Sequence, residues 1–90
     1  MDKKPSIEIY TKDYCGFCRK ALALLGKKDV SFVQHRLEDD PKLSSQMEQR
    51  AKGASTVPQI FINDAHIGGC DELHALDRNG ELDELLKTEQ

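Results

Sequence analysis

Hydrophobic and polar residues follow two periodicities in the first third of the chain. Residues 6–10 alternate with a period of two, which predicts a strand with Ile7 and Ile9 on one face. After the first cysteine, apolar residues return at steps of three and four, which predicts a helix that Gly26 ends. The β-branched and aromatic residues of 30–35 predict a second strand, which a helical crossover places parallel to the first.

A second helix is predicted after this βαβ unit. Asp40 provides an acidic N-cap, Pro41 suits the first helical position, and Gly53 ends the helix. Its inward face carries Leu43, Met47 and Ala51.

The remaining pattern predicts a hairpin followed by helices. Two short strands, 59–62 and 65–67, flank a two-residue turn at 63–64. Apolar residues at helical spacing over 71–77, and again over 82–86, predict helical segments. We therefore expect an α/β fold of order βαβαββα, with a four-stranded mixed sheet and helices on both faces.

Length and composition restrict the class of protein. Ninety residues, 38% of them hydrophobic and 32% charged, suit one globular domain spanning residues 1–90. The longest apolar run, 21–25, is far shorter than a membrane span, and Glu8 interrupts the apolar stretch that a signal peptide needs. We expect a cytoplasmic protein without a membrane partner. A net charge of −3 also argues against nucleic acid as a partner.

The three cysteines introduce the first specific chemistry. An odd number cannot form a closed set of disulfides, and Cys15 and Cys18 form a C-x-x-C pair at the predicted strand-to-helix junction. The Cys15 sulfur would face the positive end of the helix dipole, with Lys12, Arg19 and Lys20 nearby. Such surroundings lower a cysteine pKa from about 8.5 to between roughly 3.5 and 7.5. We expect Cys15 to be the nucleophile and Cys18, further inside the helix, to be the resolving thiol.

A zinc site and inert buried thiols are the alternatives for this pair. Structural zinc sites usually combine two such pairs, or cysteine and histidine at short spacing. The βαβ context favours redox chemistry, and we predict no metal site and assign the histidines no role. The other candidate ligands are isolated in the sequence: Cys70, His35, His66 and His74.

Three segments in the same order resemble the dithiol glutaredoxins: YTKDYCGFC at 10–18, TVPQIFI at 56–62 and IGGCDEL at 67–73. The resemblance covers nearly the whole chain. It implies a thioredoxin fold and a glutathione-dependent enzyme that reduces glutathione mixed disulfides and protein disulfides. Its partners would be glutathione, as co-substrate, and disulfide-containing client proteins, with the enzyme itself a monomer.

The resemblance also implies a glutathione site. Lys12 would meet the glycyl carboxylate, and Val57 would offer its backbone to the cysteinyl part if its bond to Pro58 is cis. The N–H groups of Cys70 and Asp71 would bind the γ-glutamyl carboxylate, and the Asp71 side chain would pair with the ammonium. The full set is Lys12, Phe17, Thr56, Val57, Pro58, Gly69, Cys70 and Asp71.

Local patterns alone leave other roles open for several of these residues. An exposed Lys12 is ordinarily just solvated, and Asp71 fits a helix N-cap equally well. Only about 5% of X-Pro bonds are cis, so this frequency predicts a trans Val57–Pro58 bond. Cys70 by itself resembles a small buried hydrophobe without a catalytic role.

The chain departs from the family pattern at two places. Gly16 and Phe17 stand between the cysteines, where family members commonly have proline and tyrosine. On the second predicted helix, Ser45 stands where many carry a glutamine or arginine for the glycyl carboxylate, and Gln46 or Gln49 would have to substitute.

The tripeptide beginning at Cys15 is also similar to that of monothiol glutaredoxins, which hold iron-sulfur clusters. The alternative function is therefore a homodimer with a glutathione-ligated [2Fe-2S] cluster, in which Cys15 of each chain is a ligand. Two features of the sequence argue against this alternative. The monothiol subclass has serine at the position of Cys18, and it carries an insertion before its cysteine, whereas Lys12 lies only three residues before Cys15.

Overall fold

The computed structural model describes residues 5–87, which form a mixed sheet with helices on both faces. The strands lie in the order β2-β1-β3-β4. β1 and β2 are parallel, whereas β1 with β3 and β3 with β4 are antiparallel. The predicted fold class is confirmed. The elements are β1 (Ile7–Thr11), α1 (Gly16–Lys27), β2 (Val33–Arg36), a 3₁₀ turn η1 (Leu37–Asp39), α2 (Lys42–Arg50), β3 (Gln59–Ile62), β4 (Ala65–Gly68), α3 (Cys70–Arg78) and α4 (Glu81–Lys87).

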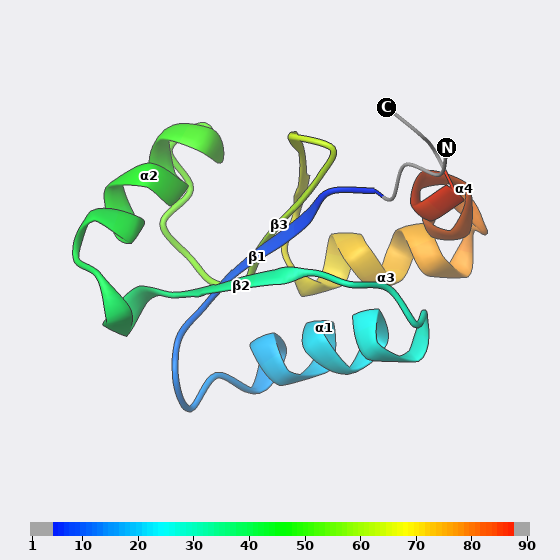
Figure 1. The fold of residues 1–90 in the computed structure, drawn as a ribbon, viewed down its shortest axis with the longest axis horizontal. Coiled ribbons are helices and arrows are strands. Elements are labelled where there is room, and N and C mark those ends of the chain that lie inside the picture. The colour runs from blue at the N-terminus through cyan, green and yellow to red at the C-terminus, as the bar shows by residue number, and fades with distance from the viewer. Residues whose placement is uncertain (1–4, 88–90) are drawn as a thin grey trace.

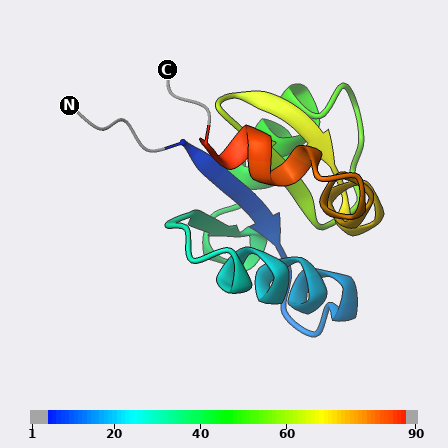
Figure 2. The same cartoon turned by 90° about the vertical axis from the view of Figure 1, so that its right-hand side faces the viewer.

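Two hydrophobic clusters form the core, one on each face of the sheet. Ile7 and Ile9 belong to the cluster under α1, α3 and α4, as their alternation predicted. Tyr10 and Phe61 point to the opposite face and pack with Met47 of α2. Figure 1 shows α2 standing apart from α1 and α3, and Figure 2 shows α3 end-on with α4 running across it.

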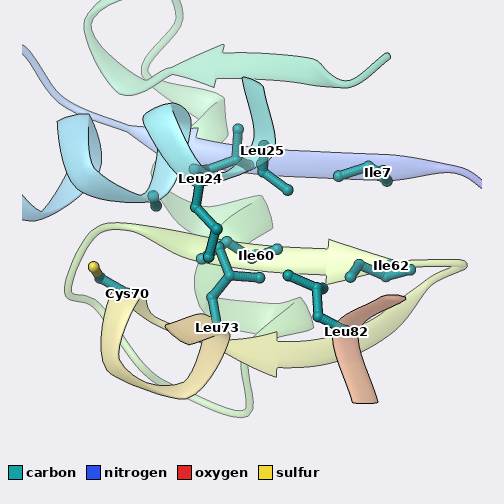
Figure 3. Packing of buried hydrophobic residues seen from close by; sticks show 10 residues of the cluster. Ile7, Leu24, Leu25, Ile60, Ile62, Cys70, Leu73 and Leu82 are labelled. Atoms are coloured by element: carbon teal, nitrogen blue, oxygen red, sulfur yellow. The ribbon is translucent and has the colours of Figure 1, made fainter. Parts of the chain in front are cut away.

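The first cluster joins helices that are distant in the sequence. Leu24 of α1 and Leu73 of α3 meet above Ile60 of β3, and Leu82 of α4 closes the cluster on one side (Figure 3). Cys70 lies at the opposite end of this cluster, at the first residue of α3. Burial of these side chains therefore fixes the start of α3 relative to the start of α1.

The predicted end of the first helix and the predicted bounds of the second strand are wrong. Gly26 does not end α1, which continues to Lys27; the left-handed residue that turns the chain is Asp29, at a φ of 56°. The second strand is not 30–35 but Val33–Arg36, because only these residues pair with β1. Val30 and Phe32 instead pack against the first cluster from the connecting segment.

The predicted hairpin turn is confirmed, and the start of α2 lies one residue later than predicted. Pro41 rather than Asp40 occupies the N-cap position, but the Asp40 carboxylate still accepts a backbone N–H of the first turn, that of Lys42, at 2.9 Å. Asn63 and Asp64 both have positive φ, which is the geometry of a type I′ turn between antiparallel strands. Among residues 5–87, no helix combines the length and the apolar character that a membrane span requires.

Candidate active site

Cys15 occupies the N-cap of α1, where β1 gives way to the helix. Its Sγ accepts a hydrogen bond from the Cys18 N–H at 3.1 Å, which satisfies one of the backbone donors left open at a helix start. The side chain is partly exposed. The sulfur is thus accessible and faces backbone N–H groups, as the sequence predicted.

The loop that carries Cys15 is held by the segment after β2. Arg36 donates two hydrogen bonds to the Asp13 carboxylate, at 2.8 and 2.7 Å, and Glu38 accepts the Asp13 N–H at 2.6 Å. Asp13 is therefore neutralised by Arg36. Lys12 forms no ion pair within the described chain, so its ammonium is available to a ligand.

The second thiol of the pair is in a different environment. Cys18 is only 2% exposed. Burial, together with its contact to Cys15, raises the pKa of Cys18 to about 12. Its thiol therefore stays protonated at neutral pH, and no disulfide joins Cys15 and Cys18.

A pocket of about 150 Å³ opens beside Cys15, between the start of α1, the segment before β3 and the start of α3. Its wall contains seven of the eight residues predicted to bind glutathione; the eighth, Lys12, lies elsewhere. The lining residues are Phe17, Thr56, Val57, Pro58, Gly69, Cys70, Asp71 and Glu72.

The segment before β3 forms the wall nearest to the sulfur. The Val57–Pro58 bond is cis, so the trans isomer expected from frequency alone is wrong. The Val57 carbonyl oxygen lies 4.0 Å from the Cys15 Sγ. The pocket and the accessible sulfur are therefore adjacent.

Two glycines shape the opposite wall. Gly68 has a φ of 120°, and a Cβ there would come within 2.9 Å of the Glu72 side chain. A Cβ on Gly69 would crowd the Pro58 carbonyl oxygen at 3.3 Å. Glycine at both positions keeps the start of α3 close to the Pro58 segment.

The N-cap of α3 is Gly69 rather than Asp71, so the capping role considered for Asp71 is wrong. Glu72 reaches back and accepts the Gly69 N–H at 2.7 Å. Asp71 is exposed in the first turn, and the N–H groups of Cys70 and Asp71 belong to the helix start, where no intrahelical acceptor exists. Glu72 is a site residue that was not predicted, although its spacing of three residues from the N-cap is a recognised signal for such a contact.

Lys12 lines a second hollow, of about 190 Å³, together with Cys15 and Cys18. It therefore lies next to the reactive sulfur without entering the first pocket. Neither hollow is lined by the α2 residues considered for the glycyl carboxylate, Ser45, Gln46 and Gln49. Gln46 instead accepts a hydrogen bond from the buried Tyr10 hydroxyl at 2.9 Å, which ties α2 to the sheet.

The third cysteine has a structural position. Cys70 is 6% exposed at the end of the first cluster, and its burial and the neighbouring Asp71 carboxylate raise the pKa of its thiol. Its sulfur is thus a buried, protonated group, whereas its backbone faces the pocket.

Among residues 5–87, no three histidine, cysteine or acidic side chains gather where they could hold a metal ion. A [2Fe-2S] cluster needs four ligands, usually thiolates, and Cys15 is the one thiol of this region that is not buried. One chain therefore does not fit a cluster by itself.

Comparisons with known proteins identify the family of this chain. The glutaredoxin family model matches residues 7–67. Glutaredoxin 3 of Escherichia coli is 50% identical over 82 residues, covering 91% of this chain and 98% of that protein.

Two solved structures extend the comparison to the fold. The solution structure of a glutaredoxin from Brucella melitensis is 42% identical, with a TM-score of 0.82, and the match covers 97% of this chain and 94% of that one. A buckwheat glutaredoxin–glutathione complex has 28% identity and a TM-score of 0.82, covering 91% of this chain and 76% of that one. The C-x-x-C pair at the start of α1, the thioredoxin fold and these matches show that the chain belongs to the glutaredoxin family of thiol-disulfide oxidoreductases.

Proposed function

We propose that the protein is a glutathione-dependent oxidoreductase that reduces glutathione mixed disulfides and protein disulfides. One observation supports this most strongly: the accessible Cys15 sulfur lies beside a pocket whose wall combines backbone donors, a carboxylate and an aromatic ring. Glutathione carries two carboxylates, an ammonium and peptide groups, and it therefore needs this mixture of partners. The proposal also includes a monomeric protein in a reducing compartment such as the cytoplasm. The compartment must be reducing because both thiols have to return to the reduced form.

Reduction of a glutathione mixed disulfide requires Cys15 alone. Its thiolate attacks the glutathionyl sulfur, the substrate S–S bond breaks, and the client leaves as a thiolate that takes up a proton. The product is a Cys15–glutathione mixed disulfide. A second glutathione thiolate then attacks the glutathionyl sulfur, which releases Cys15 and forms glutathione disulfide.

Reduction of a protein disulfide would use both thiols. Cys15 attacks one sulfur of the client disulfide, which breaks the client S–S bond, forms a Cys15–client mixed disulfide and releases the other client sulfur as a thiolate that takes up a proton. Cys18 then gives up its proton and attacks the Cys15 sulfur, which forms the Cys15–Cys18 disulfide and releases the second client thiol. Two glutathione molecules reduce this disulfide and leave as glutathione disulfide. The raised pKa of Cys18 keeps its thiol protonated during the first step, so that Cys15 rather than Cys18 attacks the client disulfide.

Glutathione recognition is proposed along the pocket wall. The Val57 backbone pairs with the cysteinyl residue, and the N–H groups at the start of α3 bind the γ-glutamyl carboxylate. The Asp71 carboxylate pairs with the ammonium, and Lys12 meets the glycyl carboxylate from the second hollow. The buckwheat relative was solved in complex with glutathione, which supports the same ligand here.

The substrate preference tests this proposal. Turnover of cysteine–glutathione mixed disulfide is compared with turnover of cystine, each with glutathione as reductant. The proposal predicts that the mixed disulfide is strongly preferred, because only it fills the pocket. Equal turnover of the two disulfides would contradict glutathione recognition, even if the protein reduces both.

A further inference from the structure

A chain of hydrogen bonds runs from β4 through β3 to the pocket. His66 Nε2 lies 2.6 Å from Gln59 Oε1. Gln59 Nε2 lies 3.0 Å from the Thr56 carbonyl oxygen and 3.3 Å from the Thr56 Oγ1. Gln59 is 4% exposed, so its amide depends on these protein partners. Thr56 lines the pocket, whereas Gln59 and His66 do not.

The chemistry of the groups fixes the direction of every bond in this chain. A backbone carbonyl can only accept, so the Gln59 atom facing the Thr56 carbonyl must be the amide nitrogen. The amide oxygen of Gln59 then faces His66, and the His66 Nε2 must carry the hydrogen. Donation therefore runs from His66 to Gln59 and from Gln59 to Thr56.

The Thr56 hydroxyl is the last group in this series of hydrogen bonds. Its oxygen accepts from Gln59, which leaves its own hydrogen to be donated elsewhere. Among residues 5–87, the Thr56 hydroxyl donates no hydrogen bond of its own. A hydroxyl held in this way is a preorganised donor for an acceptor that enters the pocket, and successive bonds of the same direction strengthen one another.

The His66 ring is itself held in place. It stacks on Phe61, with ring centroids 5.1 Å apart and an interplanar angle of 29°. The Arg50 guanidinium lies over Phe61, 4.2 Å from its centroid. The half-buried His66 ring, the first donor of these hydrogen bonds, is therefore oriented by its stacking on the buried Phe61 side chain.

We propose that Gln59 and His66 are positioning residues that orient the Thr56 hydroxyl as a donor to a carboxylate of bound glutathione. This inference rests on the proposed function. It assigns a role in substrate binding to two residues outside the pocket, and it predicts that they influence KM for glutathione substrates rather than the sulfur chemistry of Cys15.

The test uses His66→Phe, which keeps a ring against Phe61 and removes the hydrogen bond. We expect KM for cysteine–glutathione mixed disulfide to rise about two- to tenfold, the range for one lost hydrogen bond, with kcat little changed. Reduction of bis(2-hydroxyethyl) disulfide with dithiothreitol, which involves no glutathione, should be unaffected. His66→Gln, which restores an N–H donor, should return KM towards the wild-type value.

His35→Phe is the matched control. His35 also packs against an aromatic ring, Tyr10, and also makes one hydrogen bond, to Glu8, but it makes no hydrogen bond to Gln59 or Thr56. Its KM should equal that of the wild type. An unchanged KM in His66→Phe, or an equal loss with both substrates, would overturn the positioning role while leaving the proposed function intact. A wild-type protein without preference for glutathione substrates would instead overturn the proposed function and this inference together.

Discussion

The backbone N–H of Cys18 donates to the Cys15 Sγ at 3.1 Å, while the thiol of Cys18 is buried and its pKa is raised to about 12. One residue thus provides a hydrogen bond to the accessible sulfur and keeps its own sulfur protonated. Because the two groups lie one helical turn apart on α1, the same geometry brings them within reach for a disulfide once Cys15 has reacted.

This asymmetry predicts the order of alkylation. When the reduced protein is treated with substoichiometric iodoacetamide at pH 7, the label should appear on Cys15, since Cys18 and Cys70 are buried and their pKa values are raised. Peptide mapping by mass spectrometry identifies the labelled residue. Cys18→Ser should be labelled at Cys15 as well, whereas labelling of Cys18 ahead of Cys15 in the wild type would contradict the assignment.

Charge reversal tests glutathione recognition. Lys12→Glu and Asp71→Lys each replace a charge that we expect to meet the ligand, and a charge-assisted hydrogen bond contributes roughly 1.5 to 3 kcal/mol. Glutathione-dependent turnover should therefore fall by about one to two orders of magnitude in each variant. Steady-state kinetics over a range of glutathione concentrations measure this.

The control for these variants is Lys27→Glu, at the opposite end of α1 from Cys15. It makes the same charge change on an exposed lysine and should leave the glutathione dependence within about twofold. If neither Lys12→Glu nor Asp71→Lys differs from this control, the glutathione site lies elsewhere.

Glu8 on β1 predicts a pH-dependent contribution to stability. Arg50 donates to both of its carboxylate oxygens, at 2.9 and 2.8 Å, and His35 contacts it at 3.0 Å. The hydrogen bonds from Arg50 have the largest effect and lower the pKa of Glu8. Burial raises this pKa by less, and the hydrogen bond to His35 lowers it further, so the net shift is downward. A lowered pKa means that the stabilisation is present above the unfolded value of 4.5 and is lost as pH falls through the folded value.

Glu8→Gln should consequently lower the free energy of unfolding by roughly 1.5 to 3 kcal/mol at pH 7, and the difference from the wild type should shrink as the pH falls below about 4. Urea unfolding at several pH values measures it. Glu48→Gln, on the exposed face of α2, is the control and should change stability by less than about 0.5 kcal/mol. A pH-independent loss in Glu8→Gln would contradict the role of its charge.

The sequence was sufficient where a signal is local. The alternation of Ile7 and Ile9 predicted the face of β1, and the spacing of Cys15 and Cys18 predicted a more accessible and a less accessible thiol one helical turn apart, which are partly exposed and buried in the structure. The glutathione set, taken from the resemblance, comes together in one pocket except for Lys12, because helix starts and the segment before β3 meet at the same edge.

The sequence was insufficient where two distant residues share a bond. Glu8 and Arg50 are 42 positions apart, and no periodicity relates them. His66 and Gln59 lie on neighbouring strands whose pairing contains an irregularity, so their contact depends on the observed register. The error at Gly26 has a similar origin, since a glycine permits a helix end but tertiary packing decides that the turn occurs at Asp29.

The cluster-carrier alternative also has a direct test. Purified without oxygen in the presence of glutathione, the protein should be a colourless monomer under the proposed function, whereas the alternative requires two chains that each give the Cys15 thiolate, with two glutathione thiolates completing the four ligands. Visible absorption and size-exclusion chromatography measure this. A coloured dimer that reverts to a monomer when the cluster is removed would establish the alternative.

The most direct test of the central claim is turnover of a glutathione mixed disulfide by the single cysteine variants. We predict that Cys15→Ser abolishes turnover of both glutathione mixed disulfides and protein disulfides, because the accessible sulfur is lost. Cys18→Ser should retain turnover of glutathione mixed disulfides, since glutathione itself resolves the intermediate, and should lose the two-thiol reduction of protein disulfides. An active Cys15→Ser together with an inactive Cys18→Ser would contradict the account.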